Sequence, residues 1–225
     1  MLLSVDWDYF VGTSELVFDS PFWGTRDSEF DRIEAWLARA LKRSSSSFEV
    51  LRQDFPLFGD PFTLEKFAAL PCYATLSHSD AYGLLEKLQI SSVINLDSHH
   101  DLFSLSGDPS RVRPGNWAGL ALKRGLINSY TCLYPTWHEH VRVTEGFDLE
   151  RTRQELPAQF SKVDLKRGNL NLEKTDIQAV LLVQSPAWTN PLYDSVFLEL
   201  CQKLNAEFIT PPLERPFPDS SEPLS

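Results

Sequence analysis

The sequence predicts an α/β protein whose mostly parallel sheet is covered by helices on both faces. Short apolar segments alternate along the chain with longer segments in which apolar residues recur at helical spacing. The apolar run AVLLV at residues 179–183 is continuous, as is typical of strands in a doubly covered parallel sheet. Polar residues directly follow several of these runs, at the position where open α/β sheets bind ligands. We therefore expect a three-layer domain.

The first half of the chain supplies a strand and three helices before the central motif. Residues 1–10 predict a short buried strand with two acids at its carboxyl end. Residues 30–42 (FDRIEAWLARALK) have helical spacing, with acids early and basic residues late, as the helix dipole favours. The serines at 44–47 predict a loop, and residues 63–70 and 80–88 predict two further helices.

The second half continues the alternation. The predicted helix at residues 116–124 is followed by Gly125, a residue favoured just after a helix. The remaining expected elements are strands at residues 92–96, 129–134, 179–183 and around 206–209, and a helix at 193–204. We interpret residues 1–210 as a single domain and residues 211–225, which hold five prolines with acids and serines, as a mobile tail.

Charge and cysteine content restrict the classes of function. The formal net charge is -10, which argues against nucleic acid or an anionic membrane as the main partner and suits a cationic substrate. Three widely spaced cysteines form no CxxC pair, which disfavours a disulfide framework and a zinc-thiolate site and indicates a reducing, cytoplasmic compartment. The first residues lack the basic region of a signal peptide, and no apolar run approaches a membrane span.

The segment NLDSHHDLF, at residues 95–103, is the strongest candidate for chemistry. Asp97, His99 and Asp101 alternate, so an extended backbone would place all three side chains on one side. Carboxylate oxygen and imidazole nitrogen suit Mn²⁺, Fe²⁺ or Zn²⁺. A polar turn with a helix cap is the other interpretation of this segment.

Further potential ligands lie elsewhere in the chain. Asp6 and Asp8 follow the first apolar run with the same spacing, and His78 stands just before a predicted helix. Each alone has an ordinary explanation, as solvated acids of a turn or as a core or surface histidine. Together with Asp97, His99 and Asp101 they form a set of six nitrogen and oxygen ligands. This is more than a single zinc ion requires and enough for two divalent ions.

These motifs resemble those of the arginase (ureohydrolase) superfamily. That family has a His-Ser pair, then a strand, then Asp-x-His-x-Asp, and this chain has His78-Ser79 before residues 97–101. The family's Ser-x-Asp-x-Asp motif has its counterpart at residues 4–8, and its Gly-Asn-Leu-His-Gly segment has its counterpart in GNWAG at residues 115–119. The resemblance covers residues 1 to about 205 and implies an arginase/deacetylase-like three-layer fold.

Two departures narrow the resemblance to a subgroup. The Asp-x-Asp strand opens this chain, whereas arginases carry it late, and Ala118 stands where arginases have a histidine beside the substrate. Together with the opening DWDYF, this is similar to an arginase-like family of formerly unknown function that includes peptide arginases. These enzymes convert arginine side chains to ornithine, with release of urea, within ribosomally made peptides. The implied partner is therefore an arginine-containing precursor peptide.

The resemblance also implies roles for individual residues. Two Mn²⁺ ions would be bound, one by His78 and Asp101 and the other by His99 and Asp8, with Asp97 and Asp6 bridging them. Asp101 would in addition carry the proton to the leaving amine. His100 is left as a residue that bonds a nearby acid or as a plain surface histidine.

Other residues near the predicted strand ends are candidates for substrate binding. His138 and Glu139 follow a strand, and Glu139 is suited to pair with a substrate cation. Trp117 and Trp188 either stack on a guanidinium or pack in the core. Asn116 either orients substrate or caps its helix. Ser185 completes the set, because it follows the AVLLV run.

Two alternatives to a peptide arginase stay open at this stage. Histone-deacetylase-like enzymes share the sheet topology and a motif containing Asp-x-His-His, which DSHH at residues 97–100 matches, and they use one Zn²⁺ held by two aspartates and one histidine. The chain could also be a non-catalytic relative that binds peptides, although all six predicted ligands are present. The sequence gives no oligomeric state.

Overall fold

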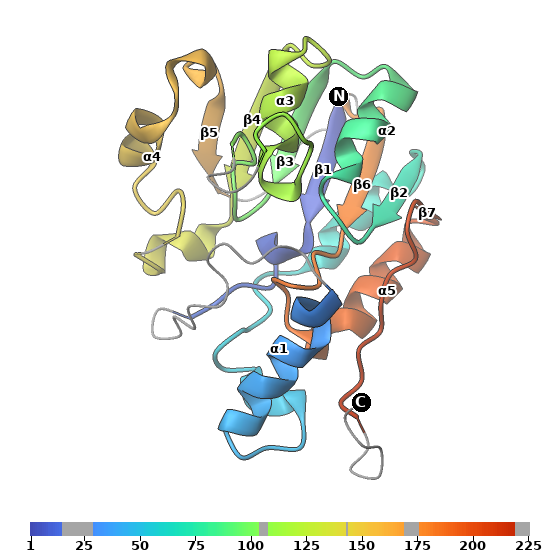
Figure 1. The fold of residues 1–225 in the computed structure, drawn as a ribbon. Helices are drawn as coiled ribbons and strands as arrows, with labels where there is room; N and C mark the ends of the chain where they lie inside the picture. Colours follow the sequence, from blue (N-terminus) through green and yellow to red (C-terminus); the bar gives the residue numbers. More distant parts are fainter. Residues whose placement is uncertain (15–28, 104–107, 143, 169–175, 219–225) are drawn as a thin grey trace.

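The protein folds around a seven-stranded sheet, seen in a computed structural model that describes residues 1–14, 29–103, 108–142, 144–168 and 176–218. All strand pairs are parallel, and the order across the sheet is β5-β4-β3-β1-β6-β2-β7. Figure 1 shows these strands side by side, with their carboxyl ends directed toward α1. The strands are β1 Leu2–Asp6, β2 Cys72–Thr75, β3 Ser92–Leu96, β4 Ser129–Tyr134, β5 Asp164–Arg167, β6 Ala179–Val183 and β7 Glu207–Phe208.

Helices cover both faces of this sheet and make the three layers. Helices α2 (Asp80–Leu88) and α3 (Trp117–Lys123) pack on one face, against side chains such as Leu2 and Leu181. Helix α5 (Asp194–Lys203) and the 3₁₀ helix Pro61–Phe67 pack on the other face, against their alternating neighbours Leu3 and Leu182. Because successive residues of a strand point to opposite faces, the buried run AVLLV contributes to both cores.

The remaining helices lie outside these layers. Helix α1 (Glu29–Lys42) builds a small core of its own with Phe48, Leu51 and Phe55, below the carboxyl edge of the sheet in Figure 1. Helix α4 (Leu149–Glu155) lies beside β5. Short 3₁₀ helices form the connections Trp7–Tyr9, Phe48–Leu51, Pro114–Asn116, Thr136–His140, Ala158–Phe160 and Pro191–Tyr193.

The predicted α/β class and parallel sheet are confirmed. The strands at 92–96, 129–134 and 179–183 and the helix at 80–88 have the expected bounds. Strands β2 and β5 and helix α4 were not predicted. The helix expected at residues 63–70 is a 3₁₀ helix two residues earlier, started by Pro61 and capped by the Asp60 side chain.

Residues 211–218, the first part of the segment that we predicted to be a mobile tail, make contacts with the rest of the domain. Arg215 is buried and paired with Asp194, and the Phe217 ring packs against Phe48 with ring centroids 5.0 Å apart. Composition did not reveal this, because one buried ion pair and one ring contact are enough to fix a proline-rich segment. Residues 219–225 lie outside the described part of the chain.

Two further sequence expectations concern cysteines and membranes. Cys72, Cys132 and Cys201 are free thiols, and all three are buried. Within the described residues, no helix is long and apolar enough to cross a membrane.

Candidate metal centre

Acidic and imidazole side chains converge at the carboxyl edge of the sheet. Asp6 is the last residue of β1, and Asp97 directly follows β3. His78 comes shortly after β2, and Ser185 shortly after β6. Since β1 lies between β3 and β6, the topology brings together residues that are far apart in sequence. This is the edge at which open α/β sheets bind ligands.

His78 is the centre of the first group of ligands. Its Nδ1 lies 3.1 Å from Asp6 Oδ2, 3.1 Å from Asp97 Oδ2 and 3.0 Å from Asp101 Oδ2. All four side chains are buried. On the opposite side of the imidazole ring, Nε2 is 2.7 Å from Ser4 Oγ, which fixes the direction of the ring.

His78 Nδ1 is surrounded by acceptors but lacks a hydrogen-bond partner among the described atoms. Although three carboxylate oxygens surround Nδ1 of His78, none is oriented to hydrogen bond with it, and no other described atom does so. A buried nitrogen facing converging carboxylates is costly unless a cation lies between them. The donor set contains nitrogen and oxygen and no thiolate, which suits a divalent ion such as Mn²⁺, Fe²⁺ or Zn²⁺. The residues therefore fit a metal ion.

A second group shares Asp97 with the first. His99 Nδ1 lies 3.0 Å from Asp8 Oδ2 and 3.6 Å from Asp97 Oδ1. Asp97 thus directs Oδ2 toward His78 and Oδ1 toward His99, which is the geometry of a carboxylate that bridges two ions. The two sets of potential metal ligands, Asp6–His78–Asp97 and Asp8–Asp97–His99, contain five of the six predicted ligands. The sixth, Asp101, lies against His78.

The backbone brings these ligands together by turns rather than by the extended conformation that we predicted. Strand β1 ends at Asp6, and Asp8 lies in the 3₁₀ helix that follows, where its amide donates to Asp6 Oδ1 at 3.1 Å. Strand β3 ends at Leu96, and the His99 amide donates to Asp97 Oδ1 at 2.8 Å. Residues two apart also lie close together in such turns. The side chains therefore converge as predicted, but through turns and not through an extended backbone.

Asp101 is held by the first turn of α3. The amides of Ala118 and Gly119 both donate to the Asp101 carbonyl at 3.2 Å, and the Trp117 indole N–H donates to Asp101 Oδ2 at 2.7 Å. Asp101 has a φ of 52°, which is rare for a residue other than glycine. Ser185 has a φ of 46° and donates its hydroxyl to Asp6 Oδ2 at 2.6 Å. Strained residues of this kind cluster at functional sites.

The carboxylates of the cluster stabilise positive charge on the histidines beside them. Burial lowers the pKa of His78, but the nearby Asp101, Asp6 and Asp97 outweigh this effect and raise the pKa well above its usual value. His99 behaves in the same way beside Asp8 and Asp97. Either protons or divalent cations can supply the charge that these carboxylates require.

The pKa values of the carboxyl groups are shifted in opposite directions. Burial and the charges of Asp6 and Asp97 raise the pKa of Asp8, although His99 opposes the shift. Burial and the charge of Asp97 raise the pKa of Asp101 to about 8, against the effect of His78. Burial opposes the ionisation of Asp97 too, but the close contacts and positive charges of His78 and His99 hold its pKa below the usual range. Asp97 is therefore the permanent anion at the middle of the cluster.

Behind Asp97 lies a residue that we did not single out from the sequence. Asn95 Nδ2 donates to Asp97 Oδ2 at 2.9 Å and lies 3.0 Å from the Tyr130 hydroxyl, which donates to the His100 carbonyl at 2.9 Å. Asn95 is fully buried in β3. A buried asparagine in an apolar strand, two residues before an aspartate, was the available sequence signal.

His100 faces away from the centre, as one of the two interpretations predicted. Its Nδ1 accepts from the Leu102 amide at 3.1 Å, its Nε2 lies 3.9 Å from Glu145 Oε2, and its own amide donates to that oxygen at 2.9 Å. Glu145 was not identified from the sequence either, since it lies in a loop without a motif. It places a half-exposed carboxylate beside the cluster.

The second group of ligands is the more open of the two. The His99 side chain is 39% exposed, whereas the other ligands are buried. The Trp188 ring lies against His99, with ring centroids 5.2 Å apart. A substrate would therefore approach from the side of His99.

Several predicted substrate contacts have other roles. Asn116 is buried and joins its own loop, accepting from the Arg113 amide and donating to the Arg111 carbonyl. Trp117 and His138 are fully buried, so neither offers a surface to a substrate; for Trp117 the core interpretation holds, with the added bond to Asp101.

The remaining candidates differ in their access to the centre. Glu139 is exposed, but its carboxylate pairs with Arg167 at 3.2 Å. Ser185 is nearly buried and donates to Asp6. Among the predicted substrate residues, Trp188 is the one that is both partly exposed and next to a ligand.

The chain matches no protein-family model, no curated protein and no solved structure.

Proposed function

We propose that the protein is a hydrolase of guanidinium groups that uses two Mn²⁺ ions to convert peptidyl arginine to ornithine and urea. The main support is the geometry of Asp97, whose two oxygens face His78 and His99 in two adjoining ligand groups. Two such groups sharing one carboxylate fit a pair of ions better than a single ion. The motif resemblance to arginase-like enzymes supplies the reaction type.

The residues divide into two ion sites. His78, Asp6, Asp97 and Asp101 would hold one ion, and His99, Asp8 and Asp97 the other. When bound, the ions supply the lowered pKa of water that provides a nucleophile near neutral pH. The chain's own hydrogen bonds from Ser185, Asn95 and Trp117 orient the carboxylates for this task.

The reaction requires the transfer of a proton to the leaving nitrogen. The oxygen of water adds to the guanidinium carbon, the bond from that carbon to the side-chain nitrogen breaks, and this nitrogen gains the proton that makes it the ornithine amine. The resemblance to arginase-like enzymes assigns this transfer to Asp101. Its carboxyl belongs to the first ligand group, with Oδ2 3.0 Å from His78 Nδ1, so it would lie beside the water that the ions activate.

The negative charge of the site and its exposure on one side favour an arginine within a peptide over free arginine as the substrate. The acidic cluster and the net charge of -10 complement a guanidinium cation. Ala118, at the position of the arginase histidine, belongs to α3 and is fully buried in the core, so it offers no group to the backbone of a free amino acid. The exposed side of His99 and Trp188 leaves an approach for a side chain carried on a longer chain.

The test is to incubate the Mn²⁺-loaded protein with free arginine and with arginine-containing peptides from its genomic neighbourhood. We expect loss of one CH₂N₂ per modified arginine by mass spectrometry, with release of an equal amount of urea. The Asp97→Asn variant, similar in shape but without the bridging charge, should release none. Absence of urea from every substrate would contradict the proposal.

One observation favours a second candidate. The group of Asp6, Asp97 and His78 contains two aspartates and one histidine, which is the ligand set of single-zinc deacetylase-like amidohydrolases. Metal analysis separates the two functions, because one tightly bound zinc per chain would support the deacetylase-like function and two manganese ions the guanidinium hydrolase.

A further inference from the structure

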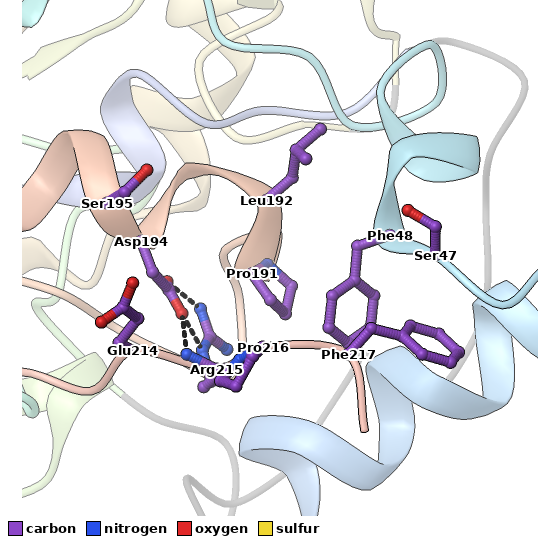
Figure 2. Close-up of a pocket in the computed structure, with 10 residues that line it drawn as sticks. All are labelled: Ser47, Phe48, Pro191, Leu192, Asp194, Ser195, Glu214, Arg215, Pro216 and Phe217. Atoms are coloured by element: carbon purple, nitrogen blue, oxygen red, sulfur yellow. Dashed lines mark hydrogen bonds and ion pairs between the residues drawn. The ribbon is translucent and has the colours of Figure 1, made fainter. Parts of the chain in front are cut away.

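A buried ion pair joins the C-terminal part of the chain to helix α5. Arg215 Nε lies 2.7 Å from Asp194 Oδ2, and Arg215 Nη2 lies 2.6 Å from Asp194 Oδ1. Both side chains are almost inaccessible, with exposed fractions of 4% and 2%. Figure 2 shows this pair at the edge of a small pocket, with Pro191 and Phe217 nearby. A two-point contact between guanidinium and carboxylate fixes direction as well as distance.

The remaining N–H groups of this guanidinium bind backbone carbonyls. Arg215 Nη1 donates to Pro186 O and to Arg32 O, and Nη2 donates to Thr189 O at 3.0 Å. With the two bonds to Asp194, all five donors of the arginine are satisfied. Two of the three carbonyls belong to residues 184–190, which we call the site loop.

A second attachment lies at the start of the same loop. The Gln184 side chain accepts from the Leu213 amide and donates to the Leu213 carbonyl, each at 2.7 Å. Gln184 is fully buried and also donates to Asp194 Oδ1 at 3.1 Å. Residues 211–217, which we call the strap, thus hold the site loop at Gln184, Pro186 and Thr189.

The site loop in turn touches both ligand groups of the metal centre. Ser185, in its left-handed conformation, donates to Asp6 Oδ2 of the first group. Trp188 packs on His99 of the second group. A residue in a strained conformation keeps it only when its surroundings impose it. Here those surroundings are the residues on either side of Ser185, and the strap binds both of them.

We propose that Arg215 is a positioning residue, through which the strap holds Ser185 and Trp188 against the metal centre. The proposal rests on the metal centre of the proposed function and not on the bond that is cleaved. It assigns a role at the site to a segment that, among the described residues, forms no hydrogen bond or ion pair with any of the six candidate ligands. Without the strap, the six candidate ligands would stay at the edge of the sheet. Asp6 would lose its contact with Ser185, and His99 would lose its contact with Trp188.

The test uses the full-length protein with Arg215→Lys. Lysine keeps the charge next to Asp194, but a single ammonium group cannot span Asp194, Pro186 and Thr189 together. Hydrogen exchange followed by mass spectrometry, without added metal, should show faster exchange in residues 184–190, including the Trp188 amide that donates to Ser185 O. Exchange in β6 should be unchanged. Mn²⁺ affinity, measured by titration calorimetry, should fall about tenfold, as for loss of other residues that support metal ligands.

The matched control is Arg151→Lys. Arg151 also pairs with a carboxylate, Glu155, but both side chains are more than half exposed and belong to α4, which lies beside β5. This variant should match the wild type in exchange and in Mn²⁺ affinity. Unchanged exchange at residues 184–190 in Arg215→Lys would overturn the proposal. Faster exchange throughout β1 and β6 would overturn it too, because the strap would then support the whole fold.

The two proposals fail in different ways. If the wild-type protein binds no divalent ion, the metal centre is wrong, and the positioning role at that centre falls with it. If the wild type binds Mn²⁺ but Arg215→Lys binds it equally tightly, the metal centre stands and the positioning role is wrong.

Discussion

The indole nitrogen of Trp117 lies 2.7 Å from Oδ2 of Asp101, the same oxygen that lies 3.0 Å from His78 Nδ1. Trp117 thereby orients, from inside the core, the carboxylate of a candidate metal ligand. It explains the tryptophan of the GNWAG segment without any contact to substrate. The backbone amides of the next two residues hold the Asp101 carbonyl, so one helical turn controls both ends of this aspartate.

Trp117→Phe should therefore weaken metal binding more than it weakens the fold. Phenylalanine preserves most of the buried ring but cannot donate to Asp101. We expect Mn²⁺ affinity to fall about tenfold or more in calorimetric titrations, with a loss of unfolding free energy of about 1–3 kcal/mol in urea denaturation.

The control for this variant is Trp137→Phe, which removes another buried indole bond, to the Tyr9 carbonyl at 3.1 Å. It should cost similar stability but leave Mn²⁺ affinity within about twofold. Equal loss of affinity in both variants would show that Trp117 acts through general packing.

Gly119→Ala should destabilise the protein, although alanine favours helices. A Cβ at this position would lie 1.8 Å from the Leu102 carbonyl oxygen, so the segment after Asp101 would have to move. We expect a loss of at least about 2 kcal/mol in urea denaturation. Gly83→Ala in α2 is the matched control, because its Cβ would meet no atom within 4 Å. It should stabilise the protein by about 0.5–1 kcal/mol.

Metal stoichiometry should distinguish the bridging ligand from the others. Asp97 faces both histidines, whereas Asp8 faces only His99. We expect Asp97→Asn to lose both ions and Asp8→Asn to lose one, as measured by elemental analysis after gel filtration. Circular dichroism should show that both variants stay folded. Retention of both ions by Asp97→Asn would rule out the bridge.

Mn²⁺ should bind more tightly as pH rises. Neighbouring carboxylates raise the pKa of His78 and His99, and burial and neighbouring charges raise that of Asp8 and bring Asp101 to about 8. Near pH 7 the two histidines and Asp101 therefore hold protons that a metal ion must displace. Calorimetry at pH values from about 6 to about 8, in buffers of different ionisation enthalpy, should show increasing affinity and net proton release. Affinity independent of pH would contradict this.

His138 should make the fold less stable in acid. Burial lowers its pKa from 6.5 to about 3, against the effect of its bond to the Glu145 carbonyl. The unfolded chain therefore binds a proton that the folded chain does not. The contribution of neutral His138 to the free energy of unfolding is fully present above pH 6.5. It is lost as the pH falls toward 3, by up to about 1.4 kcal/mol per pH unit.

This loss should shrink in His138→Asn, whose amide can still donate to Glu145 O but does not titrate. Urea denaturation at pH 7 and pH 5 should show a smaller difference for this variant than for the wild type. His140→Asn, at an exposed position, should keep the wild-type difference.

The sequence was most informative where apolar runs were long or continuous. Strands β3, β4 and β6 and helix α2 were predicted with their true bounds. Strand β1 was predicted too long, because the apolar residues continue into the 3₁₀ helix that follows Asp6. Strand β2 was missed, since CYAT is short and carries a polar and a small residue. Strand β5, DLKR, has one buried leucine among charged residues, so no alternation was visible.

The convergence of the six candidate metal ligands was predictable because each lies at or after the end of a strand at the same edge of the sheet, and because a cation site needs several acids. The residues around them were harder to find. Glu145 and Arg215 bond to residues that are distant in the sequence, and Asn95 is a lone polar residue within an apolar strand, so one sequence contains no periodic signal for them. The predicted substrate residues largely turned out to be buried, because position after a strand does not reveal whether a side chain points inward.

The central place of β1 has a consequence for synthesis. This strand pairs with β3 on one side and with β6 on the other, so half of its hydrogen-bonding ladder stays open until residues 179–183 have left the ribosome. Until then, an apolar edge remains available to other nascent chains, a recognised route to aggregation. Asp6 also lacks its partner Ser185 during this interval. A translational pause before β6 would therefore prolong exposure of the strand that carries Asp6.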